Sequence, residues 1–255
     1  MTHGKVEIPG VRVEHVLEDI ESLNRRARTG ELEVTAISCA SYPAIAGTYR
    51  IMDPGASMGK GYGPIVVAKR DYDEATLATE SIAVPGLGTT AYLLLRLVLG
   101  DPPVIVVPFD RILQVVLDEQ AHAGLLIHEG QITYPGLGLV KVLDLGERWT
   151  KETGLPLPLG INVTRRDLGE TLAVQLSEAL RASIRYAHAH PEEAVGYALR
   201  YGRGIDAATC TRFVHMYVND YTVTLGEEGR RALETLYRRA VERELLATMP
   251  PLDPL

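Results

Sequence analysis

The spacing of apolar residues divides the chain into short strands and longer helices. Short runs of β-branched and other apolar residues predict buried strands at 33–38, 65–68, 81–84, 104–107 and 124–128. Between them, apolar residues three or four positions apart predict helices at 16–27, 90–99 and 112–120. This alternation is typical of an α/β fold, and we expect its strands to be largely parallel.

The last ninety residues follow a different pattern. Helical periodicity dominates there, with few strand signals, at 168–188, 191–200, 207–217 and 227–246. Turn-forming residues gather near 71–79 and again near 153–160. We interpret these two places as candidate crossings between two lobes.

Composition and charge narrow the class of partner. The 255 residues include 33 acidic and 26 basic side chains, a formal charge of −7. Phosphate binding relies on concentrated Lys and Arg, so we expect a small-molecule partner and no nucleic acid. No apolar run has the length of a membrane span or an export signal, so we also expect no membrane partner. Cys39 and Cys210 lie far apart in the sequence, which suits a reduced, cytoplasmic setting.

The segment 123–130 has the pattern of a buried strand that ends in His128 and Glu129. Ligands of open α/β sheets gather beyond the carboxyl ends of the strands, so this pair lies where chemistry is expected. A neutral imidazole can abstract a proton near pH 7, and Glu129 could orient it or raise its basicity. The alternative, which spacing alone favours, is a core histidine satisfied by a backbone carbonyl.

A glycine-bearing turn, 85–89, joins a predicted strand to the apolar helix that begins at Thr90. Such a helix end presents free N–H groups and the hydroxyls of Thr89 and Thr90, which attract anions. An ordinary helix cap explains the same residues equally well, since Thr is a favoured cap without any ligand. No Gly-Lys-Ser/Thr follows, so the turn is not a P-loop.

Other polar or glycine-rich segments give weaker signals. The loop 59–63 could face a cleft, but its composition is better explained as structural. Cys39, next to Ser38 at a strand end, is most simply a small buried apolar residue. The histidines outside 123–130 show no paired-ligand spacing, so we expect no metal site.

Seven stretches of the sequence carry a resemblance to one known family. They are LEDIESLNRRA (17–27), ISCASY (37–42), GYGPIVVAK (61–69), VPGLGTTAYLLL (84–95), AGLLIHEGQITYPGLGLVKVLDLGERW (123–149), TGLPLPLG (153–160) and HMYVNDYTVTLGEEG (215–229). In this order they resemble the 1,4-dihydroxy-6-naphthoate synthases, the cyclic dehypoxanthinyl futalosine lyases of the futalosine route to menaquinone. The resemblance covers nearly the whole chain.

The resemblance implies a particular fold. It is an α/β, two-lobed, type II periplasmic-binding-protein-like fold with a helical C-terminal part, which encloses the ligand between the lobes. Lobe 1 would comprise residues 1–75 and 166–255, and lobe 2 residues 76–165. The family is cytoplasmic despite its binding-protein ancestry, and we expect a monomer.

The same resemblance implies an activity. The chain would be a carbon–carbon lyase that converts cyclic dehypoxanthinyl futalosine to 1,4-dihydroxy-6-naphthoate, with loss of a three-carbon fragment. His128 would be the proton acceptor that starts the cleavage. The family implies no metal and no organic cofactor.

The family's ligand contacts can also be carried over to this sequence. They imply that the substrate, a small carboxylate, is bound at a strand end and at a helix start, by Ala36, Ile37 and Ser38 and by Thr89, Thr90 and Ala91. Glu129 and Tyr134 are candidates to support the base.

Two departures from the family pattern bear on these expectations. Members often carry a lysine where this chain has Ala36, so the substrate carboxylate would need another basic partner, for which Lys69 and Arg111 are candidates. Members also begin with a further strand and loop before the segment matching 3–7. We therefore expect a misassigned start or a shortened chain.

Two other functions compete with this interpretation. Chorismate dehydratase shares the fold and the pathway, but its members lack the combined His-Glu strand end and TGLPLPLG signature. A non-catalytic solute-binding protein would bind a small anion in the same cleft, although we would expect an export signal and a lipid-anchoring cysteine. Assays with each substrate discriminate between these functions.

Overall fold

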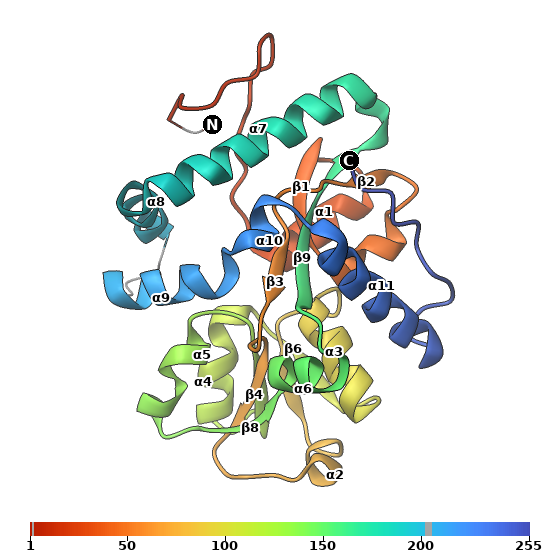
Figure 1. Cartoon of the computed structure of the whole chain (residues 1–255). Helices are drawn as coiled ribbons and strands as arrows, with labels where there is room; N and C mark the ends of the chain where they lie inside the picture. The colour runs from red at the N-terminus through yellow and green to blue at the C-terminus, as the bar shows by residue number, and fades with distance from the viewer. Residues whose placement is uncertain (2, 202–205) are drawn as a thin grey trace.

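The computed structural model of the protein describes residues 1, 3–201 and 206–255 and arranges them around two sheets (Figure 1). In the first sheet, three short strands each pair antiparallel with one long strand. The short strands are β1 (Val34–Ser38), β2 (Tyr49–Ile51) and β3 (Ser57–Gly59), and the long one is β9 (Leu157–Arg165). The order β1-β9-β2 leaves β1 at an edge of this sheet.

The second sheet has five strands in the order β6-β5-β7-β4-β8. They are β4 (Ile65–Ala68), β5 (Ile82–Val84), β6 (Val104–Val106), β7 (Ala123–Leu126) and β8 (Val140–Asp144). β5 runs parallel to β6 and β7, whereas β4 runs antiparallel to both of its neighbours. Figure 1 shows β9 rising from the region of the second sheet into the first.

Helices cover both sheets (Figure 1). They are α1 (Ile20–Arg28), α2 (Glu74–Leu77), α3 (Thr90–Leu99), α4 (Ile112–Leu117), α5 (Gly130–Thr133), α6 (Leu145–Thr153), α7 (Glu170–Ala189), α8 (Pro191–Ala198), α9 (Ala207–Tyr217), α10 (Asp220–Val223) and α11 (Gly226–Glu242). The described residues after β9 are helices and their connections, as the periodicity predicted.

The expectation of largely parallel strands is wrong. Within the described residues, only the pairings of β5 with β6 and with β7 are parallel. The strand 65–68 was predicted with its correct bounds, but it pairs antiparallel with β7 and β8. The apolar pattern of one strand reports burial on both faces and does not record which strand lies beside it, or in which direction.

The first predicted crossing is also misplaced. The chain leaves the first sheet after Gly59 and enters the second at Ile65, whereas 71–79 forms a loop and α2 beside the second sheet. The return takes place where the second crossing was expected, because α6 ends at Thr153 and β9 begins at Leu157. The division into lobes at 75 and 165 stays a prediction, although β4 pairs in the second sheet and β9 in the first.

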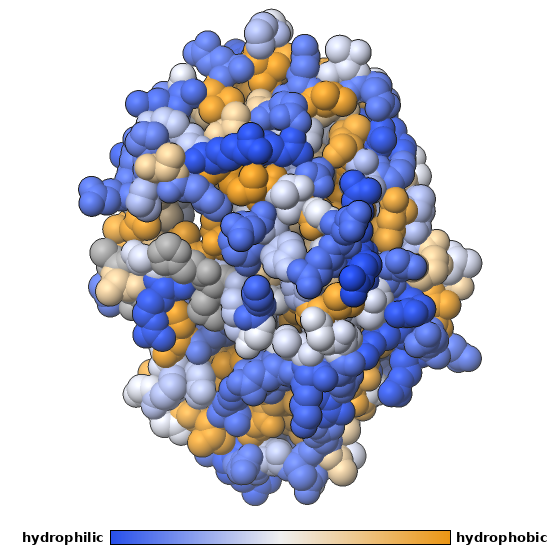
Figure 2. Space-filling model, in the orientation of Figure 1, coloured by the Kyte–Doolittle hydropathy of each residue, from blue (hydrophilic) through white to orange (hydrophobic). Residues whose placement is uncertain are grey.

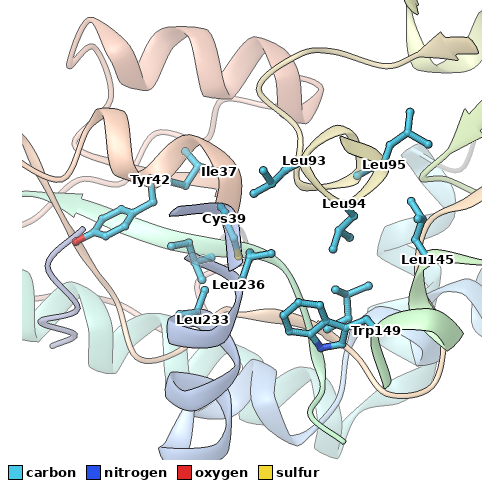
Figure 3. Close-up of a cluster of buried hydrophobic side chains, with 14 of the residues drawn as sticks. Ile37, Cys39, Tyr42, Leu93, Leu94, Leu95, Leu145, Trp149, Leu233 and Leu236 are labelled. Atoms are coloured by element: carbon cyan, nitrogen blue, oxygen red, sulfur yellow. The ribbon is translucent and has the colours of Figure 1, made fainter. Parts of the chain in front are cut away.

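One large hydrophobic core connects the two sheets. It contains buried residues of β1 and β9, of β4, β5 and β7, and of α3, α6 and α11. Figure 3 shows Leu94 of α3, Trp149 of α6 and Leu236 of α11 directed toward a common interior. Burying one such side chain contributes about 1.5–3 kcal/mol, so α3 is held firmly between the sheets. A smaller cluster, with Ile65 and Ile112, lies under the turn after β7.

The visible face of the molecule mixes polar and apolar side chains (Figure 2). Figure 2 shows that the face seen in Figure 1 is mostly hydrophilic, with smaller apolar patches between the polar side chains. Scattered patches of this kind are normal for globular proteins. Among the helices in the described part of the chain, none has the length and apolarity that crossing a membrane requires.

Candidate functional site

His128 lies in the turn between β7 and α5, and both nitrogens of its ring have backbone partners. Nε2 lies 2.7 Å from the carbonyl oxygen of Phe109, and Nδ1 lies 2.9 Å from the backbone nitrogen of Gly130. The ring of Phe109 also packs edge-on against the imidazole. The residue is 9% exposed. His128 is therefore held on a rigid support, by a backbone carbonyl of the kind that the core-histidine alternative expected.

The two partners decide where the proton of the neutral ring resides. A carbonyl oxygen can only accept a hydrogen bond, so Nε2 of His128 carries the hydrogen and donates it to Phe109. A backbone N–H can only donate, so Nδ1 accepts from Gly130 through its lone pair. Nδ1 is thus the basic nitrogen of His128, fixed by the hydrogen bond at the other side of the ring.

Glu129 and Tyr134, the two residues named as support for the base, lie in different environments. A carboxylate oxygen of Glu129 lies 3.7 Å from Nδ1 of His128, close enough to stabilise a positive charge on the ring. Tyr134 is half-buried and packs against the smaller hydrophobic cluster. Its local hydrogen bonds, from the backbone N–H groups of Gly138 and Leu139 to its carbonyl, close a turn.

The C-terminal helices hold the His128 turn from the other side. Tyr217 of α9 donates a hydrogen bond to Oε1 of Gln131 at 3.1 Å, and Gln131 donates from Nε2 to the carbonyl of Leu126 at 2.9 Å. Burial raises the pKa of Tyr217, so its hydroxyl remains a donor throughout the neutral range. The sequence pattern did not single out either residue, because they meet only in the folded chain.

Thr89 and Thr90 begin α3, and their hydroxyls are committed to partners within the protein. Thr89 Oγ1 donates to the carbonyl of Gly86 at 2.8 Å and caps the helix by accepting from the N–H of Tyr92. Thr90 Oγ1 donates to Leu159 of β9 at 2.7 Å and accepts from the N–H of Ala40. Each hydroxyl has one hydrogen, so neither has a second one for a ligand.

The first backbone N–H groups of α3 remain as donors. Among the described hydrogen bonds, none uses the N–H of Thr90 or Ala91, as expected for the first turn of a helix. Ala36, Ile37 and Ser38 belong to β1, and the 3-10 helix that follows it, Cys39–Ala44, contacts α3, where the N–H of Ala40 donates to Thr90. The structure thus brings together the two groups of residues predicted to bind the substrate.

Asn24 of α1, which the sequence pattern did not identify, connects these two groups. Its carboxamide bonds to both the backbone and the hydroxyl of Ser38, and its Nδ2 lies 3.4 Å from the carbonyl of Gly88. Glu21, one helical turn earlier, accepts from the N–H of Gly88 at 3.3 Å. The sequence did contain a signal for this pair, since the polar residues Glu21 and Asn24, three positions apart, interrupt the apolar face of the predicted helix 16–27.

The turn 85–89 and His128 emerge at the same edge of the second sheet. They follow β5 and β7, which are parallel neighbours, so both segments leave at the carboxyl ends of their strands. β4 is antiparallel to β7, and its end near Lys69 therefore lies at the opposite edge, where Lys69 pairs with Glu119. This excludes Lys69 as a partner of a ligand beside His128. Arg111 is exposed and lies two residues from Phe109.

Two cavities lie away from these residues, against α6 and α11. Their volumes are about 330 and 410 Å³. Arg148, Glu152 and Arg239 form ion pairs among their walls, so the charges there are largely compensated. Within the described ranges, no group of three His, Cys, Asp or Glu side chains could hold a metal ion. Burial raises the pKa of the Cys39 thiol, which makes it a poor nucleophile.

Comparison with known proteins identifies the family of this chain. A family model described as "Menaquinone biosynthesis" matches residues 1–242, nearly the whole chain. The chain belongs to this menaquinone biosynthesis family. A similar relative is the 1,4-dihydroxy-6-naphthoate synthase of Thermus thermophilus, 45% identical over 250 residues, which cover 98% of this chain and 91% of that one.

Solved structures give the fold of this family member. A crystal structure of a protein from Archaeoglobus fulgidus is similar, with a TM-score of 0.92 and 50% identity over 96% of this chain and 91% of that one. The alkanesulfonate-binding protein of Xanthomonas axonopodis has a TM-score of 0.67 at 14% identity, over 91% and 82% of the two chains. The expected type II periplasmic-binding-protein-like fold is confirmed.

Proposed function

We propose that the chain is a 1,4-dihydroxy-6-naphthoate synthase, a lyase that cleaves a carbon–carbon bond of cyclic dehypoxanthinyl futalosine. The observation that carries this proposal is the 45% identity, over 98% of the chain, with the relative of that name from Thermus thermophilus. The aligned region is long enough to include every part of the candidate site: α1, the start of α3 and the His128 turn.

We assign the role of general base to His128, through Nδ1. The carbonyl of Phe109 keeps the ring hydrogen on Nε2, so Nδ1 carries the lone pair, which becomes available when its hydrogen bond from the N–H of Gly130 is broken. A proton taken from a carbon next to a carbonyl creates an imidazolium, which the carboxylate of Glu129 at 3.7 Å stabilises. A positioned base of this kind contributes about 10²- to 10⁴-fold in rate.

Substrate binding is assigned to the corner where β1 meets α3. The N–H groups of Thr90 and Ala91 at the helix start suit a ligand oxygen, and the helix dipole adds to their attraction for negative charge. The hydroxyl of Ser38 is connected to the turn before this helix through Asn24, whose Nδ2 lies 3.1 Å from that hydroxyl and 3.4 Å from the carbonyl of Gly88. Hydrogen bonds that strengthen as charge develops on the substrate would supply the remaining acceleration.

The proposal includes a cofactor-independent, monomeric, cytoplasmic enzyme. The His128 turn supports cofactor independence, since the base, the carboxylate of Glu129 as its counter-charge and the hydrogen-bond donors all come from the protein itself. Cys39 and Cys210 are buried and unpaired, which suits a reducing compartment. Prolonged dialysis against a chelator is expected to leave kcat unchanged within about twofold, and light scattering is expected to give the mass of one chain.

The deciding experiment supplies the purified protein separately with cyclic dehypoxanthinyl futalosine and with chorismate, and follows products by mass-resolved chromatography. We expect 1,4-dihydroxy-6-naphthoate from the first substrate and no reaction with the second. Conversion of chorismate would identify a dehydratase instead. Tight binding of either compound without turnover would favour a non-catalytic binding protein.

A further inference from the structure

Asn24 is a buried side chain whose hydrogen bonds converge on Ser38. The residue is 1% exposed. Oδ1 accepts from the backbone N–H of Ser38 at 2.8 Å, and Nδ2 donates to Oγ of Ser38 at 3.1 Å and to a carboxylate oxygen of Glu21 at 3.1 Å. The orientation of the carboxamide follows from chemistry, because the Ser38 N–H can only donate and so must face the oxygen of Asn24.

This orientation determines what the Ser38 hydroxyl can do. Its oxygen already accepts a hydrogen bond from Nδ2 of Asn24, so its own hydrogen must point elsewhere. Among the described hydrogen bonds, none has the Ser38 hydroxyl as donor, although the residue is only 3% exposed. A buried hydroxyl with an uncommitted hydrogen costs free energy unless an acceptor arrives. The described geometry therefore leaves the Ser38 hydroxyl as a donor at the end of β1.

The packing around Asn24 leaves little freedom for a different arrangement. Glu21 fills the space beside the turn before α3, where a Cβ at Gly86 would collide with it. Ser41 donates to the carbonyl of Gly88 at 2.8 Å, so that oxygen is also occupied. The carboxylate of Glu21 has no hydrogen to donate, and the hydroxyl hydrogen of Ser41 is already used for Gly88. Neither side chain can therefore easily replace Asn24 as the donor to Ser38.

We propose that Asn24 is a positioning residue of the proposed reaction, which acts by turning the Ser38 hydroxyl toward an oxygen acceptor of the substrate. The inference rests on the proposed function, since it takes Ser38 as a substrate contact. Asn24 itself does not touch the substrate. Its contribution is to fix the direction of one donor before the substrate binds, which reduces the ordering cost of binding.

The test reverses the direction of the hydrogen bond between residue 24 and the Ser38 hydroxyl, while the side chain at position 24 keeps its shape. In Asn24→Asp, a carboxylate oxygen replaces Nδ2 and accepts from the Ser38 hydroxyl, which turns the hydrogen inward. The new charge also faces Glu21, and that repulsion by itself destabilises the fold. The double variant E21Q/N24D removes this repulsion, because the amide of Gln at position 21 can donate to Asp at position 24. E21Q alone is the matched control, because it retains Asn24 and its bonds to Ser38. Its single amide oxygen can accept from Nδ2 of Asn24 or from the N–H of Gly88, but not from both.

We expect E21Q/N24D to unfold in urea at a midpoint no lower than that of E21Q, because the amide at position 21 can accept from Gly88 and donate to the new carboxylate. Its KM for cyclic dehypoxanthinyl futalosine should nevertheless be about 3- to 10-fold higher, with kcat within about twofold. Ser38→Ala is expected to raise KM by a similar factor in the E21Q background. Adding N24D to that variant is expected to cause little further change, because the hydroxyl through which Asn24 acts is then missing.

Several results would overturn the inference. An unchanged KM in E21Q/N24D would show that Asn24 is merely structural. A further rise in KM on adding N24D to E21Q/S38A would show that it acts by another route. Failure of the proposed function is separate, since the wild-type protein would then not turn over cyclic dehypoxanthinyl futalosine at all. Titration of each variant with 1,4-dihydroxy-6-naphthoate gives a second measure of affinity that does not need turnover.

Discussion

The corner around Asn24 and the turn around His128 are both buried and polar, but they are built differently. At the corner, α1, β1 and the start of α3 meet, and Asn24 bonds to residues 14 and 64 positions away. At the turn, the partners of His128 are Phe109, 19 positions earlier, and Gly130, two positions later. The comparison teaches that the base is fixed by backbone groups, whereas the donor is aligned by another side chain.

The largest effect is expected from the turn. His128→Ala removes the proposed base, so kcat should fall about 10²- to 10⁴-fold. The carbonyl of Phe109 and the N–H of buried Gly130 lose their partner, so the free energy of unfolding should also drop by about 1–3 kcal/mol, which leaves the protein folded. Steady-state kinetics and urea denaturation measure the two quantities on the same sample. Undiminished turnover would remove His128 from the mechanism, and loss of folding would return it to the role of a core histidine.

The next effect tests the corner. Thr90→Val keeps the shape of the side chain but leaves the carbonyl of Leu159 and the N–H of Ala40 without their partner. Unsatisfied buried groups cost about 1–3 kcal/mol each, so the free energy of unfolding should drop by at least about 1 kcal/mol. Thr89→Ala is the comparison, because losing a helix cap costs about 1 kcal/mol. A Thr90→Val protein as stable as the wild type would mean that this bridge is dispensable.

A smaller effect concerns the charge next to the base. The carboxylate of Glu129 favours the protonated form of His128, and that form is inactive as a base. In Glu129→Gln, protonation of His128 should therefore require a lower pH, and the acid limb of kcat/KM should move to lower pH. A pH–rate profile checks this. A shift to higher pH would contradict the assigned contact.

The smallest effect is expected at Tyr134. Its ring packs against the smaller hydrophobic cluster, so Tyr134→Phe retains most of what the side chain does. Turnover and KM should remain within about twofold of the wild type. A large fall in kcat would mean that the Tyr134 hydroxyl belongs to the site, and that the His128 turn extends further than its described contacts indicate.

Part of the fold could be predicted from the sequence because its signals are local. The helices 90–99 and 207–217 and the strand 65–68 have the bounds that periodicity gave. β9 was missed, since Gly160 and the prolines of TGLPLPLG resemble a turn, although the strand begins inside that segment. β2 and β3 are three residues each, too short to show a period.

The candidate site divides in the same way. His128 and Thr89 were found from a strand end and a helix start, both of which are visible in a short window of sequence. Asn24 and Gln131 were not identified, because a polar residue on a helix is ordinarily a solvated one. What distinguishes them is a partner far along the chain, and the sequence pattern of one element does not contain that information.

The order of residues by itself determined that a strand would deliver a histidine and a carboxylate to its carboxyl end, and that a capped apolar helix would begin near Thr90. Both follow from local preferences of backbone and side chain. Only the tertiary structure decided which way the strands run, which nitrogen of His128 holds its hydrogen, and which group faces Ser38. Those outcomes depend on hydrogen-bond partners that packing brings together from distant parts of the chain, because a buried donor or acceptor must find its partner wherever the fold supplies one.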